Sequence, residues 1–133
     1  MDTRSVNILV VDDDRRTCTY LARILSAQDW RVDTACDGST ALALVQDNPY
    51  NAVLLDYRMP GMDGAELCRR IRQRQPDVRA VFLTGFPTID TVYPAMAAGG
   101  ERVLAKPVKS AELVSTLEDE LAKQAHDRGE SET

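Results

Sequence analysis

Short apolar runs alternate along the chain with segments whose apolar residues recur every three or four positions. Runs of this length, bounded by turn residues, are typical of buried strands, and the three-to-four spacing is typical of helices. The predicted strands cover residues 6–11, 30–36, 52–55, 78–83 and 102–104, and the predicted helices lie near 18–25, 41–45, 67–71, 88–98 and 113–121. This alternation predicts an α/β fold with a doubly wound, five-stranded parallel sheet covered on both faces by five helices.

Polar residues follow four of the five predicted strands. Asp12 and Asp13 come after the first strand, Asp56 after the third, Thr84 after the fourth and Lys106 after the fifth. In parallel α/β sheets, ligands bind beyond the carboxyl ends of the strands. We therefore expect these five side chains to converge on one edge of the sheet.

Three carboxylates at one edge repel each other, and their pKa values rise unless a positive charge lies among them. A divalent cation and Lys106 are two such charges, and Mg²⁺ commonly completes its ligand shell with waters and phosphate oxygens. Asp56, alone at its strand end, suits a nucleophile that forms an acyl phosphate, whereas the adjacent Asp12 and Asp13 suit metal binding. Thr84 and Lys106 suit contacts with phosphoryl oxygens.

Four motifs make the resemblance to a known family plain. The sequence reads ILVVDDD at 8–14, LLDYRMPGMDG at 54–64, LTG at 83–85 and KP at 106–107. With these motifs at these spacings, residues 6–122 resemble the receiver domain of bacterial two-component response regulators. The resemblance implies a flavodoxin-like receiver fold with strand order 2-1-3-4-5.

The resemblance also implies a function, phosphorelay signal transduction. Asp56 would accept a phosphoryl group from a histidine kinase or phosphotransfer protein, and this would switch the output surface of the domain. Mg²⁺ would be held by Asp12, largely through water, by Asp13, by Asp56 and by the backbone carbonyl of Arg58. The peptide bond between Lys106 and Pro107 is expected to be cis, a form whose free-energy cost is low only before proline. Such a domain catalyses only its own phosphorylation and dephosphorylation, and its partners include an output domain or effector and, as one option, a second copy.

Four positions depart from the family pattern or are expected to modulate it. Receivers commonly carry an aromatic residue where this chain has Val103, so switching is expected to rest on Thr84 and the backbone. Pro94 falls within the fourth predicted helix, where proline removes a hydrogen bond, so we expect that helix to be short, kinked or mobile. Arg58 and Phe86 are bulky and flank the predicted path of the attacking water, which favours a long-lived phosphate.

Composition and charge bound the remaining possibilities. The chain has 133 residues, is 44% hydrophobic and carries a net charge of −5, which fits one domain and disfavours nucleic-acid binding. Residues 118–133 hold six acids and two bases, so −4 of the charge lies there. We expect a receiver domain over 1–124 and a polar tail or linker start over 125–133. The acidic end of the chain and the four arginines at 69, 70, 72 and 74 are expected to be solvated.

The cysteine pattern and hydropathy point to a cytoplasmic protein that does not enter a membrane. The three cysteines, Cys18, Cys36 and Cys68, show no C-x-x-C spacing, and free thiols fit a reducing compartment. No apolar stretch approaches the roughly 20 residues of a membrane span.

Two other functions compete with the phosphoryl-accepting switch. An aspartate-nucleophile phosphatase would need an Asp-x-Asp-x-Thr/Val motif, but Asp12 and Asp14 are followed by Arg16. A receiver-like module that only binds partners is the other alternative. Asp14 itself is expected to cap the helix that follows, a role in which aspartate is strongly favoured.

Overall fold

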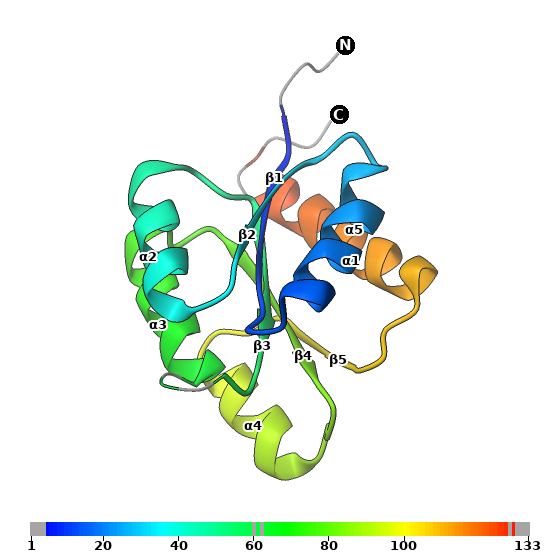
Figure 1. The fold of residues 1–133 in the computed structure, drawn as a ribbon. Coiled ribbons are helices and arrows are strands. Elements are labelled where there is room, and N and C mark those ends of the chain that lie inside the picture. The colour runs from blue at the N-terminus through cyan, green and yellow to red at the C-terminus, as the bar shows by residue number, and fades with distance from the viewer. Residues whose placement is uncertain (1–4, 60, 62, 128, 130–133) are drawn as a thin grey trace.

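A five-stranded parallel sheet lies between two layers of helices (Figure 1). The structure, a computed structural model, describes residues 5–59, 61, 63–127 and 129. The strand order is β2-β1-β3-β4-β5, so the predicted α/β class, strand number and order are confirmed. The elements are β1 (Asn7–Val11), α1 (Arg15–Ser26), β2 (Arg31–Ala35), α2 (Gly38–Asp47), β3 (Ala52–Asp56), α3 (Gly64–Arg74), β4 (Arg79–Thr84), α4 (Ile89–Ala97), β5 (Arg102–Ala105) and α5 (Ser110–Asp127).

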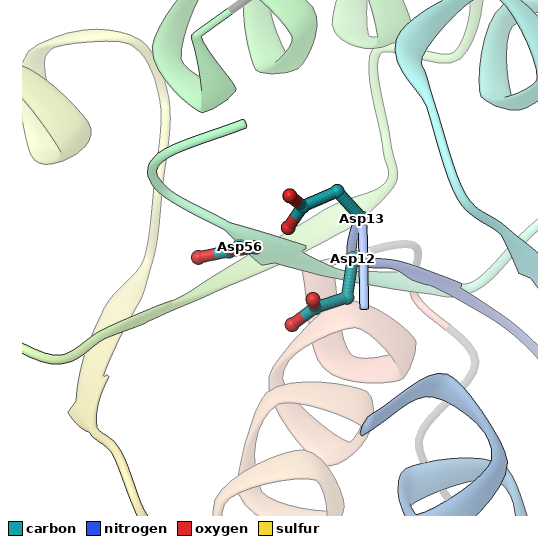
Figure 2. Close-up of side chains that lie close together, drawn as sticks. All are labelled: Asp12, Asp13 and Asp56. Atoms are coloured by element: carbon teal, nitrogen blue, oxygen red, sulfur yellow. The ribbon is translucent and has the colours of Figure 1, made fainter. Parts of the chain in front are cut away.

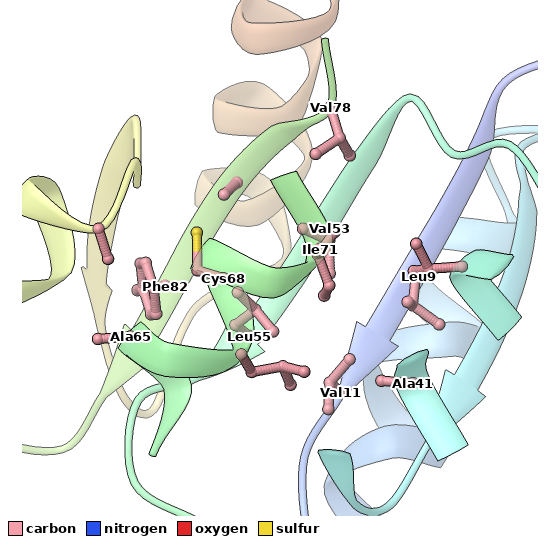
Figure 3. Packing of buried hydrophobic residues seen from close by; sticks show 14 of the residues in the cluster. Leu9, Val11, Ala41, Val53, Leu55, Ala65, Cys68, Ile71, Val78 and Phe82 are labelled. Atoms are coloured by element: carbon pink, nitrogen blue, oxygen red, sulfur yellow. The ribbon is translucent and has the colours of Figure 1, made fainter. Parts of the chain in front are cut away.

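The apolar strands bury both of their faces because successive side chains point to opposite sides of the sheet. Leu9 and Leu55 pack with Phe82 under α2 and α3, as Figure 3 shows. The neighbouring residues Ile8 and Leu54 belong to a second cluster, under α1 and α5. This two-sided burial fixes the strands, and thereby the positions of the residues that follow them.

Aspartates begin three of the helices. The side chain of Asp14 accepts a hydrogen bond from the backbone N–H of Arg16 at 3.0 Å, which confirms its predicted role as a cap. Asp37 and Asp63 do the same at the starts of α2 and α3. An N-cap carboxylate satisfies a backbone donor that the helix leaves unpaired. The first helix thus starts immediately after the two aspartates of the predicted site.

The fourth helix is short, as predicted from Pro94. It has nine residues, and Pro94 lies inside it. Proline has no N–H to donate to the carbonyl of Asp90, four residues earlier. The chain leaves the helix through Gly99, whose φ of 107° favours glycine.

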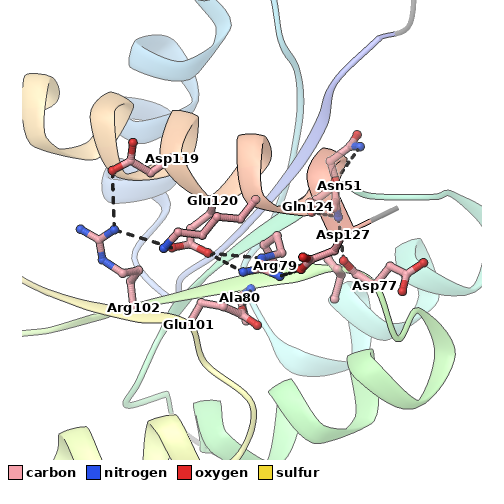
Figure 4. A network of polar contacts seen from close by, with 12 residues as sticks. Asn51, Asp77, Arg79, Ala80, Glu101, Arg102, Asp119, Glu120, Gln124 and Asp127 are labelled. Carbon is pink, nitrogen blue, oxygen red and sulfur yellow. Dashed lines mark hydrogen bonds and ion pairs between the residues drawn. The ribbon is translucent and has the colours of Figure 1, made fainter. Parts of the chain in front are cut away.

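The acidic end of the chain is not simply solvated, and this expectation was wrong for Glu120. Its side chain is 1% exposed and lies within ion-pair distance of Arg79, Arg102 and Lys123. Figure 4 shows Glu120 reaching from α5 to the first residues of β4 and β5. We call these four residues the amino-edge cluster. α5 itself continues to Asp127, past the expected boundary at 124, and the boundary stays a prediction.

The arginine face of α3 also differs from the expectation at one position. Arg69 and Arg70 are exposed and pair with Glu66 on the helix surface. Arg72 instead donates to the carbonyl of Val78 at 2.6 Å and pairs with Glu101. It therefore ties α3 to the starts of β4 and β5, and the expectation of a solvated side chain was wrong for this residue.

Candidate functional site

Three carboxylates gather at the carboxyl edge of the sheet. Asp12 and Asp13 follow β1, and Asp56 is the last residue of β3 (Figure 2). One oxygen from each carboxylate lies within 4.8 Å of the others. Asp12 is 1% exposed and Asp56 is 7% exposed, whereas Asp13 faces solvent. The β1–β3 pairing of Val11 with Leu55 produces this arrangement, because it places the following residues side by side.

Lys106, which directly follows β5 at the same edge of the sheet, brings a positive charge to these carboxylates. Its Nζ lies 3.0 Å from Oδ2 of Asp12 and 3.2 Å from Oδ1 of Asp56. Its backbone N–H donates to the carbonyl of Thr84 at 2.8 Å, and the peptide bond to Pro107 is cis. We call Asp12, Asp13, Asp56 and Lys106 the carboxyl-edge group.

The carboxyl-edge group contains more negative than positive charge. Burial raises the pKa of Asp56 above its usual value, and the nearby carboxylate of Asp12 raises it further, against the opposing effect of Lys106. Burial alone would lower the pKa of Lys106, but its hydrogen bonds and ion pairs with Asp12 and Asp56 outweigh burial and raise it. One lysine therefore does not neutralise the buried carboxylates.

The loop after β4 carries Thr84 and Phe86. Thr84 is buried at the end of its strand, and its hydroxyl accepts a hydrogen bond from the backbone N–H of Phe86 at 3.1 Å. The Phe86 side chain is exposed, and its carbonyl accepts from the hydroxyl of Thr91 at 2.6 Å. Thr91 thus holds this loop from α4, a role that the sequence reasoning missed. Its spacing from Thr88, typical of a helix start, was the available signal.

The other predicted site positions, Arg58 and Val103, differ in how close they lie to the carboxyl-edge group. The backbone N–H of Arg58 donates to Oδ1 of Asp56 at 3.4 Å, and the Arg58 side chain is exposed. Val103 is half-buried and packs against the cluster under α2, α3 and α4. A Cβ on Gly64 would lie 2.6 Å from the carbonyl oxygen of Asp56, so only glycine fits where α3 starts beside the site. Pro60 and Met62 of the motif lie outside the described residues.

The donor atoms of the carboxyl-edge group suit a hard cation. Its three aspartates, Asp12, Asp13 and Asp56, offer carboxylate oxygens, which Mg²⁺ and Ca²⁺ prefer. Asp13 is open to solvent, so water molecules can complete a ligand shell, as Mg²⁺ requires. The surplus of buried negative charge gives such a cation a favourable place. Among the described residues, no helix combines the length and apolarity needed to cross a membrane.

Comparison with protein families and curated proteins gives consistent matches. A family model described as the response regulator receiver domain matches residues 8–118. The response regulator MprA of Mycobacterium sp. (strain KMS) is 37% identical over 93% of this chain, and the match covers 54% of MprA. The transcriptional regulatory protein ZraR of Klebsiella oxytoca is 36% identical over 92% of the chain and 28% of ZraR. The chain thus spans about half or less of these relatives.

Solved receiver structures share the fold over almost their whole length. The receiver domain of an HD domain-containing protein from Pseudomonas fluorescens Pf-5 has a TM-score of 0.88 and 31% identity, covering 92% of this chain and 99% of that one. A CheY-like receiver from Methanospirillum hungatei JF-1 has a TM-score of 0.89 at 25% identity, covering 93% of this chain and 99% of that one. Both matches are to receivers with little sequence outside the shared fold.

Proposed function

This chain belongs to the response regulator receiver domains of two-component signalling, and from that premise we propose that Asp56 accepts a phosphoryl group in a Mg²⁺-dependent reaction. The donor is a histidine kinase or a phosphotransfer protein in the cytoplasm. The observation that carries the proposal is the position of Asp56, which lies beside two further carboxylates and 3.2 Å from Lys106. Ionisable groups whose pKa values are shifted by burial and by neighbouring charges are concentrated at functional sites.

Each member of the site has a distinct role in this proposal. An oxygen of Asp56 attacks the phosphorus, and the bond between the phosphorus and the donor histidine breaks. Asp12, Asp13, Asp56 and the carbonyl of Arg58 would hold Mg²⁺, which supplies neutralisation of the charge on the phosphoryl oxygens.

Two residues would then contact the phosphoryl group on Asp56. Lys106 pairs with one phosphoryl oxygen, and the Thr84 hydroxyl donates to another. Because the Thr84 hydroxyl accepts from Phe86, its reorientation would move the loop that Thr91 holds against α4. Val103 is half-buried and not aromatic, so this change would not involve the rotation of an aromatic side chain at that position. The output then passes to a further domain or a separate effector protein.

The proposal is tested by incubating the protein with acetyl phosphate and Mg²⁺ and measuring the intact mass. Wild type should gain one phosphoryl group, and Asp56→Asn should gain none because the nucleophilic oxygen is gone. Asp14→Asn is a matched control, since Asp14 is the neighbouring helix cap and asparagine caps equally well. Labelling that survives in Asp56→Asn would overturn the assignment, and absence of labelling in wild type would favour a module that only binds partners.

The same sample tests the expected lifetime of the phosphate. Arg58 and Phe86 have exposed side chains two residues beyond Asp56 and Thr84, where they can obstruct an attacking water. After removal of acetyl phosphate, the label should persist for minutes or longer. Loss of the label within seconds would contradict this part of the proposal.

A further inference from the structure

Two cysteines lie together behind the carboxyl edge of the sheet. The thiol of Cys18, on α1, is directed at the ends of β1 and β2. Its Sγ lies 3.2 Å from the carbonyl oxygen of Asp12 and 3.7 Å from that of Ala35. Ala35 is the last residue of β2, and Cys36 follows it directly. The Cys18 sulfur therefore lies beside the backbone that enters Cys36.

The Cys36 side chain is on the same side of the sheet as Cys18. Val32 and Cys36, an even number of residues apart, both pack against the cluster under α1 and α5 that contains Cys18. Ala35 belongs to the cluster on the opposite face, as the alternation of a strand requires. The Cys36 thiol is also close enough to contribute to the raised pKa of the Cys18 thiol. Alternation, packing and electrostatics thus agree that the two thiols are neighbours.

The three cysteines differ in access to solvent. Cys18 is 2% exposed, Cys68 is fully buried on the other face of the sheet, and Cys36 is partly exposed. A small oxidant would therefore reach Cys36 first, with Cys18 directly behind it. An accessible thiol with a second thiol directly behind it, able to resolve a sulfenic acid, is one of the features of redox-sensitive cysteines.

We propose that Cys18 and Cys36 are an oxidant-sensitive pair that forms a reversible intramolecular disulfide on exposure to hydrogen peroxide. The Cys36 sulfur attacks one peroxide oxygen, the O–O bond breaks, and the departing hydroxide is protonated to water. The Cys18 sulfur then attacks the Cys36 sulfenic acid, and the S–S bond forms as a second water leaves. In all, two thiols lose two electrons and two protons to one peroxide. Transient disulfides of this kind are the usual sort in a reducing compartment.

The disulfide would also act on the phosphoryl site, a consequence that rests on the proposed function. Its formation removes the hydrogen that Cys18 donates to the carbonyl of Asp12. Asp12 is one of the carboxylates that would hold Mg²⁺. Loss of an outer contact to a metal ligand typically weakens metal binding by about tenfold or more. Because Cys18 contacts the backbone carbonyl of Asp12 and not its carboxylate, oxidised protein should need up to about tenfold more Mg²⁺ for half-maximal labelling by acetyl phosphate.

The disulfide is tested by peptide mapping, because trypsin separates the three cysteines. Cleavage after lysine and arginine places them in peptides 17–23, 32–58 and 59–69. After treatment with peroxide, unfolding and alkylation, peptides 17–23 and 32–58 should appear joined, and dithiothreitol should release them. Cys68 should be alkylated before and after treatment, as an internal control. Cys36→Ser, at a partly exposed position, should leave Cys18 free for alkylation under the same conditions.

The possible results distinguish a failure of the disulfide proposal from a failure of the proposed function. Free Cys18 and Cys36 after peroxide, or Cys36 oxidised without a link to Cys18, would overturn the disulfide. A formed disulfide with an unchanged Mg²⁺ requirement would overturn its effect on the site. Failure of the reduced protein to label would count against the proposed function alone, since peptide mapping does not depend on phosphorylation.

Discussion

The two edges of the sheet each bury carboxylates, but they balance the charge in opposite ways. At the amino edge, one buried carboxylate, Glu120, meets three cations. Arg79 lies 3.0 Å away, Lys123 3.3 Å and Arg102 3.6 Å. At the carboxyl edge, the ion pairs of the described residues give the three aspartates one cationic partner, Lys106. The buried carboxylate at the amino edge is therefore balanced by cations, which also pair with the exposed Asp119 and Asp127, whereas the aspartates at the carboxyl edge have a surplus of negative charge.

The difference separates a structural cluster from a functional one. A buried carboxylate with enough cations and hydrogen bonds is satisfied within the fold, and its removal leaves its partners unpaired. A buried group of carboxylates with too few cations is unfavourable by itself and gains from a bound cation or phosphoryl group. Burial alone does not identify the site, whereas the balance of charge around the buried group does.

The largest expected effect comes from breaking the balanced cluster. Glu120→Gln keeps the shape of the side chain but leaves Arg79 without its closest anionic partner. Arg79 then keeps the exposed Asp127 as an anionic partner, so the free energy of unfolding in urea should fall by about 2 kcal/mol, the size of a lost hydrogen bond to a charged group. Asp119→Asn is the matched control, because Asp119 is an exposed neighbour that pairs with Arg102 at 3.9 Å. Its loss should change stability by less than about 0.5 kcal/mol, and equal losses in the two variants would contradict the distinction.

A smaller effect is expected when Mg²⁺ fills the unbalanced group. A ligand at ten times its dissociation constant stabilises a native protein by about 1.4 kcal/mol. Wild type and Glu120→Gln should gain the same increment, because the two clusters lie at opposite edges of the sheet and distant sites are additive. Asp13→Asn should gain less at the same Mg²⁺ concentration, since it loses one of the carboxylates. Urea unfolding with and without Mg²⁺ measures the increment, and an equal gain in Asp13→Asn would place the cation elsewhere.

The carboxyl-edge group could be predicted from the sequence because every member lies at the end of a strand or within two residues of it. The five apolar runs locate the strands, and parallel strands bring their carboxyl ends to one edge. Asp12, Asp56 and Lys106 thus follow from local patterns and one rule of topology. Even the cap at Asp14 is local, since it depends on a helix that starts at the next residue.

The amino-edge cluster could not be predicted in the same way. Glu120 and Gln124 fall on the buried stripe of α5 that includes Leu113 and Leu117, so their spacing indicated burial. Which cations they would meet depends on how α5 crosses the starts of β4 and β5, and this is a matter of packing. The same limit applies to Arg72 and Glu101, which meet across the space between α3 and β5.

The most direct test of the account is the stability of Asp56→Asn without Mg²⁺, with Glu120→Gln as the opposite case. The pKa of Asp56 is raised above 3.8 in the native protein. Between 3.8 and the raised value the native state binds more protons than the unfolded state, so stability falls as pH rises through that range. At pH 7 the ionised carboxylate is therefore unfavourable, and the neutral amide removes this penalty.

Urea unfolding at pH 7 in the presence of a chelator should show Asp56→Asn to be more stable than wild type and Glu120→Gln to be less stable. The advantage of Asp56→Asn should shrink as the pH is lowered toward 3.8, because wild-type Asp56 then becomes neutral as well. A loss of stability in Asp56→Asn at pH 7 would show that the carboxyl-edge group is already balanced, and it would contradict the central claim.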